Sequence, residues 1–382
     1  MTVALAHEYF SAHGGAERVI GSFHQMWPDA PVYTFFHDAR RYGPLDATWR
    51  LRTSFLQQFP LGGGLHRALL PLYPRAARGL RVDAGTSLLL SSTSAFIKGV
   101  SLPDATVHVA YCHSPTRYLW DWSERYLDEE VPGPLRPVVR ELLARLREDD
   151  RGFAARVDRW IANSRAVADR ITRYYGAHSE VVYPPVDVER FSAAANARAA
   201  SAPRTDYITV SRLVPYKRVD VLVEAFRGLP DRRLIVVGDG PDRSRLEALA
   251  VPNVSFIGRQ DDAETARQVA AARAFVFAAE EDFGIAPVEA QAAGTPVIAY
   301  GRGGVRESIR GQDHARPTGR FFDTQEPWAV VDAVRTFEAA NPPISAGACR
   351  DNALRFAPAR FRDEMARIVD GTIAARARAS AV

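Results

Sequence analysis

The stretch AAEEDFGIAPVEAQAAGTPVIAYGRGG, residues 278–304, has the pattern of a loop, a helix and a second strand. The apolar run AFVFAA (274–279) predicts the strand that leads into it, and PVIAYG (296–301) predicts the strand that follows. Pro287 suits the first turn of the helix between them. Two strands joined through a helix run parallel, so this stretch predicts a parallel sheet covered by helices.

The same alternation of strand and helix extends over most of the chain. Short β-branched or aromatic runs in the first half predict strands at 3–9, 32–36, 87–92, 107–112, 159–164 and 180–185. Further runs in the second half predict strands at 208–213, 233–240, 254–259, 274–279 and 296–301. Amphipathic stretches such as 219–229 and 261–272 separate them. The pattern therefore predicts an α/β protein with two Rossmann-like domains, each built on a parallel sheet.

The boundary between the halves is visible in composition. Residues 184–206 begin with two prolines and continue as a polar tract rich in alanine and serine, which predicts a linker. We expect an N-terminal domain over 1–186, a C-terminal domain over 187–357, and a final helical segment over 358–382. Apolar residues of that segment recur at near-helical spacing, so we expect it to pack back on the N-terminal domain. In such proteins ligands bind at the carboxyl ends of the strands, which favours a site in a cleft between the domains.

Composition limits the class of protein. The 382 residues carry a net charge of +4, which fits anionic ligands but is too small to predict nucleic-acid binding. Cys112 and Cys349 are the only cysteines, which favours a reducing cytoplasm over a disulfide framework. The N-terminus has the pattern of a strand and not of a secretion signal, and no apolar run is long enough to cross a bilayer. We expect a cytoplasmic protein.

The stretch 278–304 contains two glutamates, one on each side of its predicted loop. Glu281 follows a strand and Glu289 lies eight residues later on the predicted helix. Each carboxylate can accept two hydrogen bonds from neighbouring hydroxyls, as a sugar or ribose requires. Backbone N–H groups of Phe283, Gly284 and Ile285 lie beside the helix N-terminus, where a diphosphate can bind. A solvated acidic loop that caps a helix is the alternative interpretation.

The whole of 278–304 resembles the signature of the retaining glycosyltransferases of family four, whose hallmark is Glu-x7-Glu. The resemblance extends to Phe283-Gly284-Ile285, to EAQAAGTPVIA and to the Gly303-Gly304 pair. It implies the GT-B fold, with two Rossmann-like domains whose parallel sheets face a cleft. It also implies that Glu281 holds the hydroxyls of the transferred sugar and that Glu289 holds the ribose.

A second motif, SRLVPYKRVD at 211–220, follows the first predicted strand of the second half. Arg212 can bind a diphosphate as a bidentate fork, and Lys217 can bind it as a point charge. Alone, these cations could simply be solvated. Family resemblance implies that both contact the pyrophosphate of the donor.

Shorter motifs complete the resemblance in the first half. HGGAERVI at 13–20 places Gly14 and Gly15 between a strand and a helix, where backbone can approach a phosphate. AYCHSPTRYLW at 110–120 places His113 at a strand end. The resemblance implies that Gly15 contacts the donor and that His113 touches its sugar near the reacting carbon.

Glycine turns in the second half match the family less specifically. VVGDGP at 236–241 and FIGRQDD at 256–262 follow predicted strands. The resemblance implies that Gly238, Gly240, Arg259 and Gln260 lie around the nucleoside. Turns of this kind follow strands in many proteins, so ordinary loop geometry is the alternative.

No metal site is expected. The chain has no Asp-x-Asp pair after an apolar strand, and its His and Cys residues lack metal-ligand spacing. Asp149-Asp150 lies in a charged helical run and is expected on a solvated face. We therefore expect Arg212, Lys217 and helix N-termini to neutralise the diphosphate. Because no carboxylate is placed as a nucleophile, we expect retention through attack on the face from which the phosphate departs.

The acceptor and the donor base are the least constrained. Residues 47–82 hold six arginines and no acid, which favours contact with an anionic membrane or a lipid diphosphate. The alternative is a pair of helices whose arginines extend into water. The wording of 281–294 resembles mannosyltransferases of bacterial cell-surface polysaccharide synthesis, which favours GDP-mannose as donor and a glycan or lipid-linked acceptor.

Other functions remain open from the sequence. A UDP-sugar could replace GDP-mannose, because no residue separates guanine from uracil. A nucleotide-sugar epimerase would bind the same donor without an acceptor. A non-catalytic nucleotide-sugar-binding protein would bind without turnover.

Overall fold

A computed structural model describes residues 1–59, 69–198 and 203–379 of the chain. Within these ranges the chain forms two compact parts. The first part comprises residues 1–184 together with the chain from Phe361 onward, and the second comprises Pro185–Arg360. The sequence places the domain boundary at residue 186, and the two parts divide between Pro184 and Pro185.

The first part is built on a parallel sheet whose described strands lie in the order β3-β2-β1-β4-β5-β6-β7. Their bounds are β1 Val3–His7, β2 Val32–Thr34, β3 Leu51–Thr53, β4 Leu88–Thr93, β5 Val107–Cys112, β6 Arg159–Ala162 and β7 Ser179–Val181. The central strands β1, β4 and β5 are buried at every position. Their residues are mostly apolar and do not alternate with exposed positions, as expected for strands covered on both faces, and the polar residues among them, such as His7, Ser92 and His108, are buried as well.

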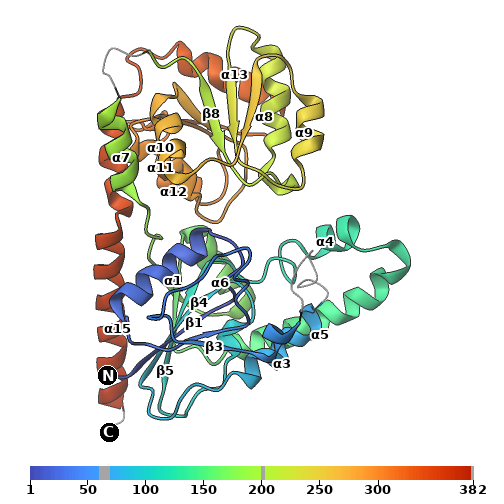
Figure 1. Ribbon diagram of the computed structural model, residues 1–382, viewed down its shortest axis with the longest axis vertical. Helices are drawn as coiled ribbons and strands as arrows, with labels where there is room; N and C mark the ends of the chain where they lie inside the picture. The colour runs from blue at the N-terminus through green and yellow to red at the C-terminus, as the bar shows by residue number, and fades with distance from the viewer. Residues whose placement is uncertain (60–68, 199–202, 380–382) are drawn as a thin grey trace. The chain divides into compact units, whose positions relative to one another are not determined.

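Helices cover both faces of this sheet (Figure 1). They are α1 Gly15–Met26, α3 Tyr73–Gly79, α4 Ser123–Glu130, α5 Arg136–Ala154 and α6 Arg165–Tyr175. The short 3₁₀ helices are η1 Phe55–Gln58, η3 Leu70–Leu72, η4 Ile97–Gly99 and η5 Gly133–Leu135. Local signals set the ends of α6, because the Ser164 side chain accepts from the Val167 N–H and Gly176 terminates the helix at φ 65°.

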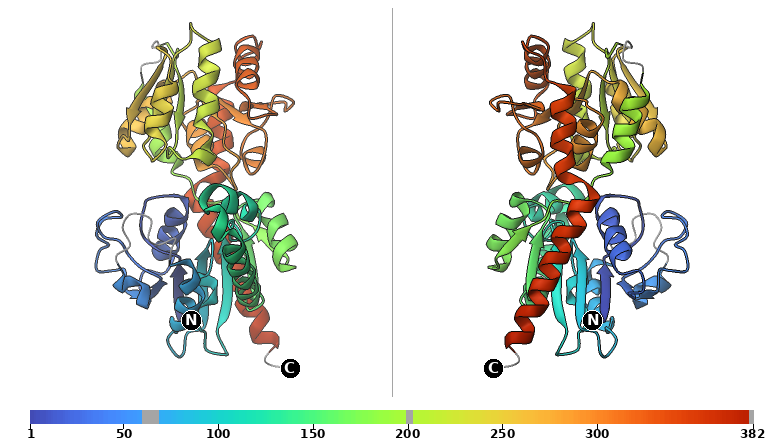
Figure 2. Two further views of the ribbon diagram at one scale, coloured as in Figure 1. Left: turned by 90° about the vertical axis from the view of Figure 1, so that its right-hand side faces the viewer. Right: turned by 90° about the vertical axis from the view of Figure 1, so that its left-hand side faces the viewer.

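The last helix, α15 (Pro358–Ala379), lies along the first part (Figure 2). Phe361, Met365, Ile368 and Val369 are buried in one core cluster with residues of β1, α1 and β5. The Phe361 ring stacks on Phe23, with 5.7 Å between ring centroids. The apolar stripe of this helix thus has its partner in the first part of the chain.

The second part holds a parallel sheet in the order β10-β9-β8-β11-β12-β13. Its strands are β8 Tyr207–Val210, β9 Leu234–Val237, β10 Val254–Gly258, β11 Ala274–Phe277, β12 Val297–Tyr300 and β13 Gly319–Phe322. Its helices are α7 Val188–Ala197, α8 Val219–Ala225, α9 Arg243–Leu249, α10 Asp262–Ala271, α11 Ile285–Ala292, α12 Val305–Ser308, α13 Pro327–Glu338 and α14 Ala346–Ala353. The 3₁₀ helices are η6 Pro215–Lys217, η7 Phe226–Gly228 and η8 Leu354–Phe356.

The predicted fold class is confirmed, since both parts are parallel α/β units. The stretch 184–206, predicted as a linker from its composition, contains the helix α7. Asp187 caps α7 at its first turn, and Val188 and Phe191 bury its apolar side. Strands β3 and β13 escaped prediction because each is short and contains polar or glycine residues.

A helix can cross a bilayer only if it is both long and hydrophobic enough. In the ranges that the structure describes, none combines the length and the hydrophobicity needed to cross a bilayer.

Candidate active site

The predicted donor-binding residues of the second part share one edge of its sheet. Arg212 and Lys217 follow β8, whereas Gly238 and Gly240 follow β9. Arg259 and Gln260 follow β10, and Glu281 follows β11. Because β8, β9, β10 and β11 are neighbours in a parallel sheet, their carboxyl ends lie at the same edge. Parallel topology therefore gathers segments that are far apart in sequence.

The loop that carries Glu281 is held by backbone contacts to the next loop. Glu281 forms an isolated bridge with Gly303, and its carbonyl accepts from the Gly304 N–H at 2.9 Å. Gly303 has φ +74°, and a Cβ there would lie 2.3 Å from the Glu281 carbonyl oxygen. Only glycine fits this position, because the conformation is left-handed and the two backbones nearly touch. The glycine pair of the motif thus fixes the place of Glu281.

The residues after Glu281 start α11. Phe283 is buried and packs edge-on against Phe356, with ring centroids 5.4 Å apart. Gly284 adopts φ +85° as the N-cap, and Ile285 is the first helical residue. Glu289 lies one helical turn further on and is only 8% exposed. The ring of Phe283 therefore belongs to the core and anchors the loop. The prediction for Phe283 concerns its backbone N–H and not its ring.

Lys217 and Glu281 form an ion pair across the edge. Their side chains are 17% and 19% exposed, so both remain accessible to a ligand. The family resemblance implies that Lys217 contacts the pyrophosphate of the donor and that Glu281 holds the sugar, whereas the structure pairs the two side chains with each other. Opposite charges in contact stabilise each other's ionised form, so the edge holds a matched cation and anion before any ligand arrives.

Arg212 lies beside this pair on the loop after β8. Its side chain is exposed, and its guanidinium donates to the Tyr216 hydroxyl at 3.3 Å. The ammonium of Lys217 lies 5.3 Å from the centroid of the Tyr216 ring. Tyr216 therefore contacts both predicted diphosphate-binding cations, and its position directly after Pro215 gave no signal of that role.

Gly238 and Gly240 have a structural requirement of their own. A Cβ at Gly238 would lie 1.9 Å from the Ser211 carbonyl oxygen, and one at Gly240 would lie 2.2 Å from that of Leu213. Glycine at both positions thus lets the loop after β9 pack on the loop after β8. Gln260 donates from its side-chain amide to the Ile257 carbonyl at 2.6 Å, and Arg259 is exposed.

In the first part, Gly14 and Gly15 begin α1. Gly14 is the N-cap and Gly15 the first helical residue. A Cβ at Gly14 would lie 2.9 Å from a carboxylate oxygen of Glu17, which sits in the first turn. The predicted glycine loop is therefore covered by an acidic side chain, a feature that the motif alone did not reveal.

His113 follows β5 and is held at three points. Its Nε2 shares a 2.7 Å hydrogen bond with the Ser92 hydroxyl, and its carbonyl accepts from the Asn163 amide at 2.9 Å. Its N–H donates to the Thr93 carbonyl at 2.9 Å. Burial, assisted by the neighbouring His7, lowers the pKa of His113 to about 3. The ring is thus neutral at physiological pH and can act as a hydrogen-bond partner but not as a cation.

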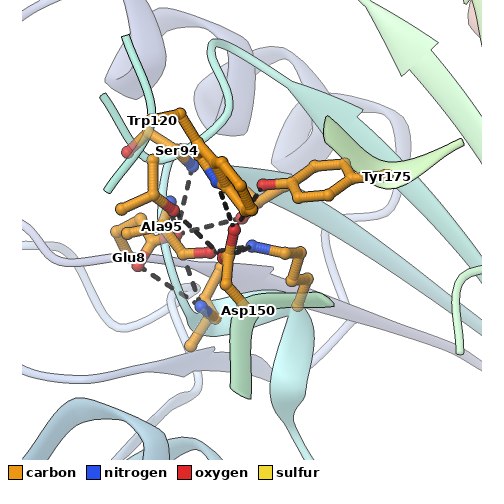
Figure 3. A network of polar contacts seen from close by, with 10 residues as sticks. Glu8, Ser94, Ala95, Trp120, Asp150 and Tyr175 are labelled. Atoms are coloured by element: carbon orange, nitrogen blue, oxygen red, sulfur yellow. Dashed lines mark hydrogen bonds and ion pairs between the residues drawn. The ribbon is translucent and has the colours of Figure 1, made fainter. Parts of the chain in front are cut away.

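The solvated face expected for Asp149-Asp150 is wrong for Asp150, which has no exposed surface and whose carboxylate faces Trp120 and Tyr175 (Figure 3). Its carboxylate pairs with Lys98 at 2.5 Å and accepts from Thr116, Trp120 and Tyr175. The period of α5 turns Asp150 inward, whereas Asp149 remains near the surface and pairs with Arg78. Four donors, from η4, from α6 and from the segment between β5 and α4, therefore meet at one buried carboxylate of α5.

A second buried carboxylate, Glu8, lies beside this cluster (Figure 3). It accepts backbone N–H bonds from Ser94, Ala95 and Ile97 and a hydroxyl bond from Thr93. These donors run from Thr93, the last residue of β4, to Ile97, the first residue of η4. Glu8 and Asp150 together hold the segments that follow β4 and β5. His113 is the first residue after β5, and Ser92 lies in β4, one residue before its end. Neither acid had a recognisable sequence signal, because their partners come from distant segments.

The basic segment 47–82 is partly satisfied within the protein. Arg50 pairs with Asp29 at 3.4 Å, and Arg78 pairs with Asp149 and lies over the Phe153 ring. Arg67 lies outside the described residues. Tyr73, Ala76 and Ala77 bury one side of α3, and the described arginines of the segment are exposed.

A metal site needs several ligating side chains close together. Within the described ranges, no three His, Cys, Asp or Glu side chains are grouped so that they could hold a metal ion.

Comparison with known families agrees with this architecture. The family described as "Glycosyltransferase Family 4" matches residues 13–190, and "Glycosyl transferases group 1" matches residues 194–355. The two matches together cover both parts of the fold. The two halves of the chain thus match these two glycosyltransferase families, and the fold is of the GT-B type.

Individual relatives are more distant. A D-inositol 3-phosphate glycosyltransferase of Mycobacterium sp. (strain KMS) is 34% identical over 173 residues, which are 40% of this chain and 39% of that protein. A similar enzyme of Streptomyces coelicolor is 30% identical over 57% of this chain and 53% of that protein. The alignments thus span about two-fifths to one-half of the curated relatives.

Solved structures match over nearly the whole chain. Sucrose-phosphate synthase from Thermosynechococcus elongatus has a TM-score of 0.71 at 17% identity, covering 98% of this chain and all of that one. Anabaena Alr3699/HepE in complex with UDP-glucose has a TM-score of 0.65 at 19% identity, covering 97% and 100%. At such identities these structures establish the shared fold.

Proposed function

We propose that this protein is a retaining glycosyltransferase that moves a hexose from a nucleoside-diphosphate donor to a glycan or lipid-linked acceptor. The observation that carries the proposal is the gathering of Arg212, Lys217 and Glu281 at one edge of a parallel sheet, in a chain of the family-four type. Cations at this edge suit a diphosphate, and a carboxylate among them suits sugar hydroxyls.

The reaction breaks the bond between the anomeric carbon and the oxygen of the β-phosphate, and negative charge develops on that phosphate. Arg212 and Lys217 stabilise this charge, in place of a divalent metal. The acceptor oxygen attacks the anomeric carbon on the face from which the phosphate departs. Its proton passes to the departing phosphate oxygen, so atoms and charge balance without a protein nucleophile.

In this proposal, donor binding replaces the Lys217–Glu281 ion pair with contacts from each residue to the donor. When a donor binds, the phosphate takes the place of Glu281 as the partner of Lys217. The freed carboxylate of Glu281 then accepts hydrogen bonds from the sugar hydroxyls. Binding of both groups replaces one ion pair with two charge-assisted sets of contacts, so neither charge is left without a partner.

Other residues have supporting roles in this proposal. Glu289 binds the ribose, and the loops at Gly238 and Gly240, at Arg259 and Gln260, and at Gly284 and Ile285 surround the nucleoside diphosphate. The first part contributes its own set, with Gly15 at a phosphate and His113 at the sugar. A neutral His113 suits a hydrogen bond to a sugar hydroxyl, because its pKa is lowered to about 3 by burial and by His7.

Two donors compete. The wording of the motif around Glu281 favours GDP-mannose, whereas the structurally similar Anabaena protein was solved with UDP-glucose and thereby favours a UDP-hexose. We propose a nucleoside-diphosphate hexose, and the base is a direct outcome of the experiment below.

For the acceptor, the exposed arginines of 47–82 support an anionic group, such as a lipid diphosphate at the inner face of a membrane. The inositol phosphate named in the mycobacterial and streptomycete relatives is also anionic. A cytoplasmic protein with peripheral membrane contact fits this acceptor.

The test is a calorimetric panel of GDP, UDP, dTDP and ADP with their common hexoses, each in Mg²⁺ and in EDTA. We expect one base to bind selectively and equally well in both buffers, and the matching sugar to be transferred with retention. Binding that needs Mg²⁺ would contradict the proposed role of Arg212 and Lys217. Binding without any turnover on phosphorylated or lipid-linked acceptors would favour the non-catalytic alternative, and release of an isomerised sugar would favour an epimerase.

Variants separate the site from the scaffold. Glu281→Gln keeps the size of the side chain but loses the charge, and we expect it to lower kcat by about 10²-fold or more. Arg212→Ala should weaken nucleotide binding by about tenfold or more. Arg227→Ala is the matched control, because Arg227 is exposed on η7 in the same part but away from the strand ends. Equal effects of Arg212→Ala and Arg227→Ala would remove Arg212 from the site.

A further inference from the structure

A row of four polar side chains in the first part leads to His113. Glu17 lies on α1, His7 ends β1, Ser92 lies on β4, and His113 follows β5. Parallel pairing places His7 directly beside Ser92, and the His113 N–H donates to Thr93, the residue after Ser92. The row is thus set by strand register and comes from four separate segments.

The row consists of two hydrogen bonds and one longer electrostatic contact. The Ser92 hydroxyl lies 3.1 Å from His7 Nδ1 and 2.7 Å from His113 Nε2. His7 Nε2 lies 3.7 Å from a carboxylate oxygen of Glu17. His7 is 1% exposed and Ser92 is fully buried, so water does not compete with these bonds.

One hydroxyl between two imidazoles couples their tautomers. A serine has a single proton to donate, so Ser92 can donate to one histidine while it accepts from the other. The carboxylate of Glu17 favours a proton on the near nitrogen of His7, Nε2. With its proton on Nε2, His7 accepts a hydrogen bond from the Ser92 hydroxyl through Nδ1, and the Ser92 oxygen in turn accepts a hydrogen bond from His113 Nε2–H. This leaves His113 Nδ1 as an acceptor.

We propose that Ser92 and His7 are positioning residues that hold His113 in the tautomer with Nδ1 as a hydrogen-bond acceptor for a hydroxyl of the bound sugar. The proposal deepens the function proposed above and rests on it for the role of the sugar. It does not rest on it for the tautomer, which is a property of the ligand-free protein.

The strand supplies a matched control. Ser91 is the neighbour of Ser92, is also fully buried, and shares a hydrogen bond of 2.8 Å with His108 Nε2. Because successive side chains of a strand point to opposite faces, this second serine–histidine pair lies across the sheet from His113. Ser91→Ala therefore removes the same atom from the same strand without touching the row.

The experiment measures the tautomers directly and the kinetics separately. Protein labelled with ¹⁵N-histidine is examined by long-range ¹H–¹⁵N NMR at pH 7.5, with the His113 signals assigned by their loss in His113→Gln. We expect wild-type His113 to carry its proton on Nε2, Ser92→Ala to change its tautomer populations, and Ser91→Ala to leave them unchanged. An Nδ1-protonated His113 in the wild type, or no change in Ser92→Ala, would overturn the proposal.

With the donor identified by the calorimetric panel, kinetics test the consequence. Ser92→Ala should lower kcat by about tenfold or more while the affinity for the free nucleoside diphosphate, which has no sugar, stays the same. His7→Asn keeps a hydrogen-bonding group near the position of Nδ1, so it should lose less activity than His7→Leu. Equal kinetic losses in Ser91→Ala and Ser92→Ala would show a merely structural role. If no donor is turned over, the function fails, but the NMR result still decides the tautomer.

Discussion

At the scale of single residues, the most consequential finding is the buried charge cluster around Asp150. Lys98 and Asp150 are both nearly inaccessible, and each also makes hydrogen bonds to neutral groups. Desolvation of two charges is costly, so such a pair is stable only while all its partners are present. The cluster ties η4, which follows β4, to the segment after β5 that begins with His113, which makes it relevant to the site as well as to the core.

We predict that Asp150→Asn lowers the free energy of unfolding of the first part by about 3–5 kcal/mol, because it leaves the Lys98 ammonium buried without an anionic partner. Asp149→Asn is the control. It removes the partly exposed pair with Arg78 and should change stability by no more than about 1 kcal/mol. Denaturant unfolding measures both, and similar small effects would mean that Lys98 finds water or another partner.

At the scale of elements, the glycines fall into those required by a loop and those merely tolerated in a helix. Gly303 has a positive φ and touches the backbone of Glu281, whereas Gly21 lies inside α1 with nothing within 4 Å of a Cβ. The two loops after β11 and β12 can pack together only because Gly303 lacks a side chain. The place of Glu281 is thus a property of two elements together.

We predict that Gly303→Ala destabilises the second part by at least about 1–2 kcal/mol, the cost of a left-handed alanine, and displaces Glu281. Donor turnover should fall more than nucleotide affinity, since Glu281 is proposed to hold the sugar. Gly21→Ala should be neutral or stabilising by about 0.5–1 kcal/mol. Thermal unfolding and steady-state kinetics measure the two effects. Full activity in Gly303→Ala would show that the loop can relax without moving Glu281.

At the scale of the whole molecule, the chain leaves the first part near Pro184 and returns to it at Phe361. The first part is therefore discontinuous in sequence, and its core needs residues from both ends of the chain. Phe361 is fully buried against Phe23 and Tyr111. Removing its ring would open a cavity in the first part although the residue lies in the last tenth of the chain.

We predict that Phe361→Ala destabilises the first part by about 3–5 kcal/mol and leaves the second part little changed. Hydrogen exchange, followed for peptides of each part, separates the two. Leu354→Ala is the control, because Leu354 is 59% exposed on η8 and its truncation should change stability by no more than about 0.5 kcal/mol. Increased exchange in β8 and β11 but not in β1 and β5 would contradict this assignment.

The α/β class and the strand–loop–helix units were predictable from local patterns in the chain. The motif that resembles family four, with its two glutamates, was visible there as well. These features are local, since apolar runs, turn glycines and Pro287 act within a few residues of the elements that they shape. Polar patterns were less informative. The charged run at Asp149-Asp150 looked solvated, and the alanine-rich tract that contains α7 looked unstructured, because neither pattern shows what packs against it.

The three-dimensional fold determines which distant groups meet. It paired Lys217 with Glu281, turned Asp150 onto Lys98, and aligned His7 with Ser92, 85 positions away in the chain. It also places Gly238 and Gly240 against the backbone of Ser211 and Leu213, which leaves no room for a side chain at either glycine. The physical reason is that strand order and register bring such groups within hydrogen-bond distance, and neither leaves a local trace in the residues concerned.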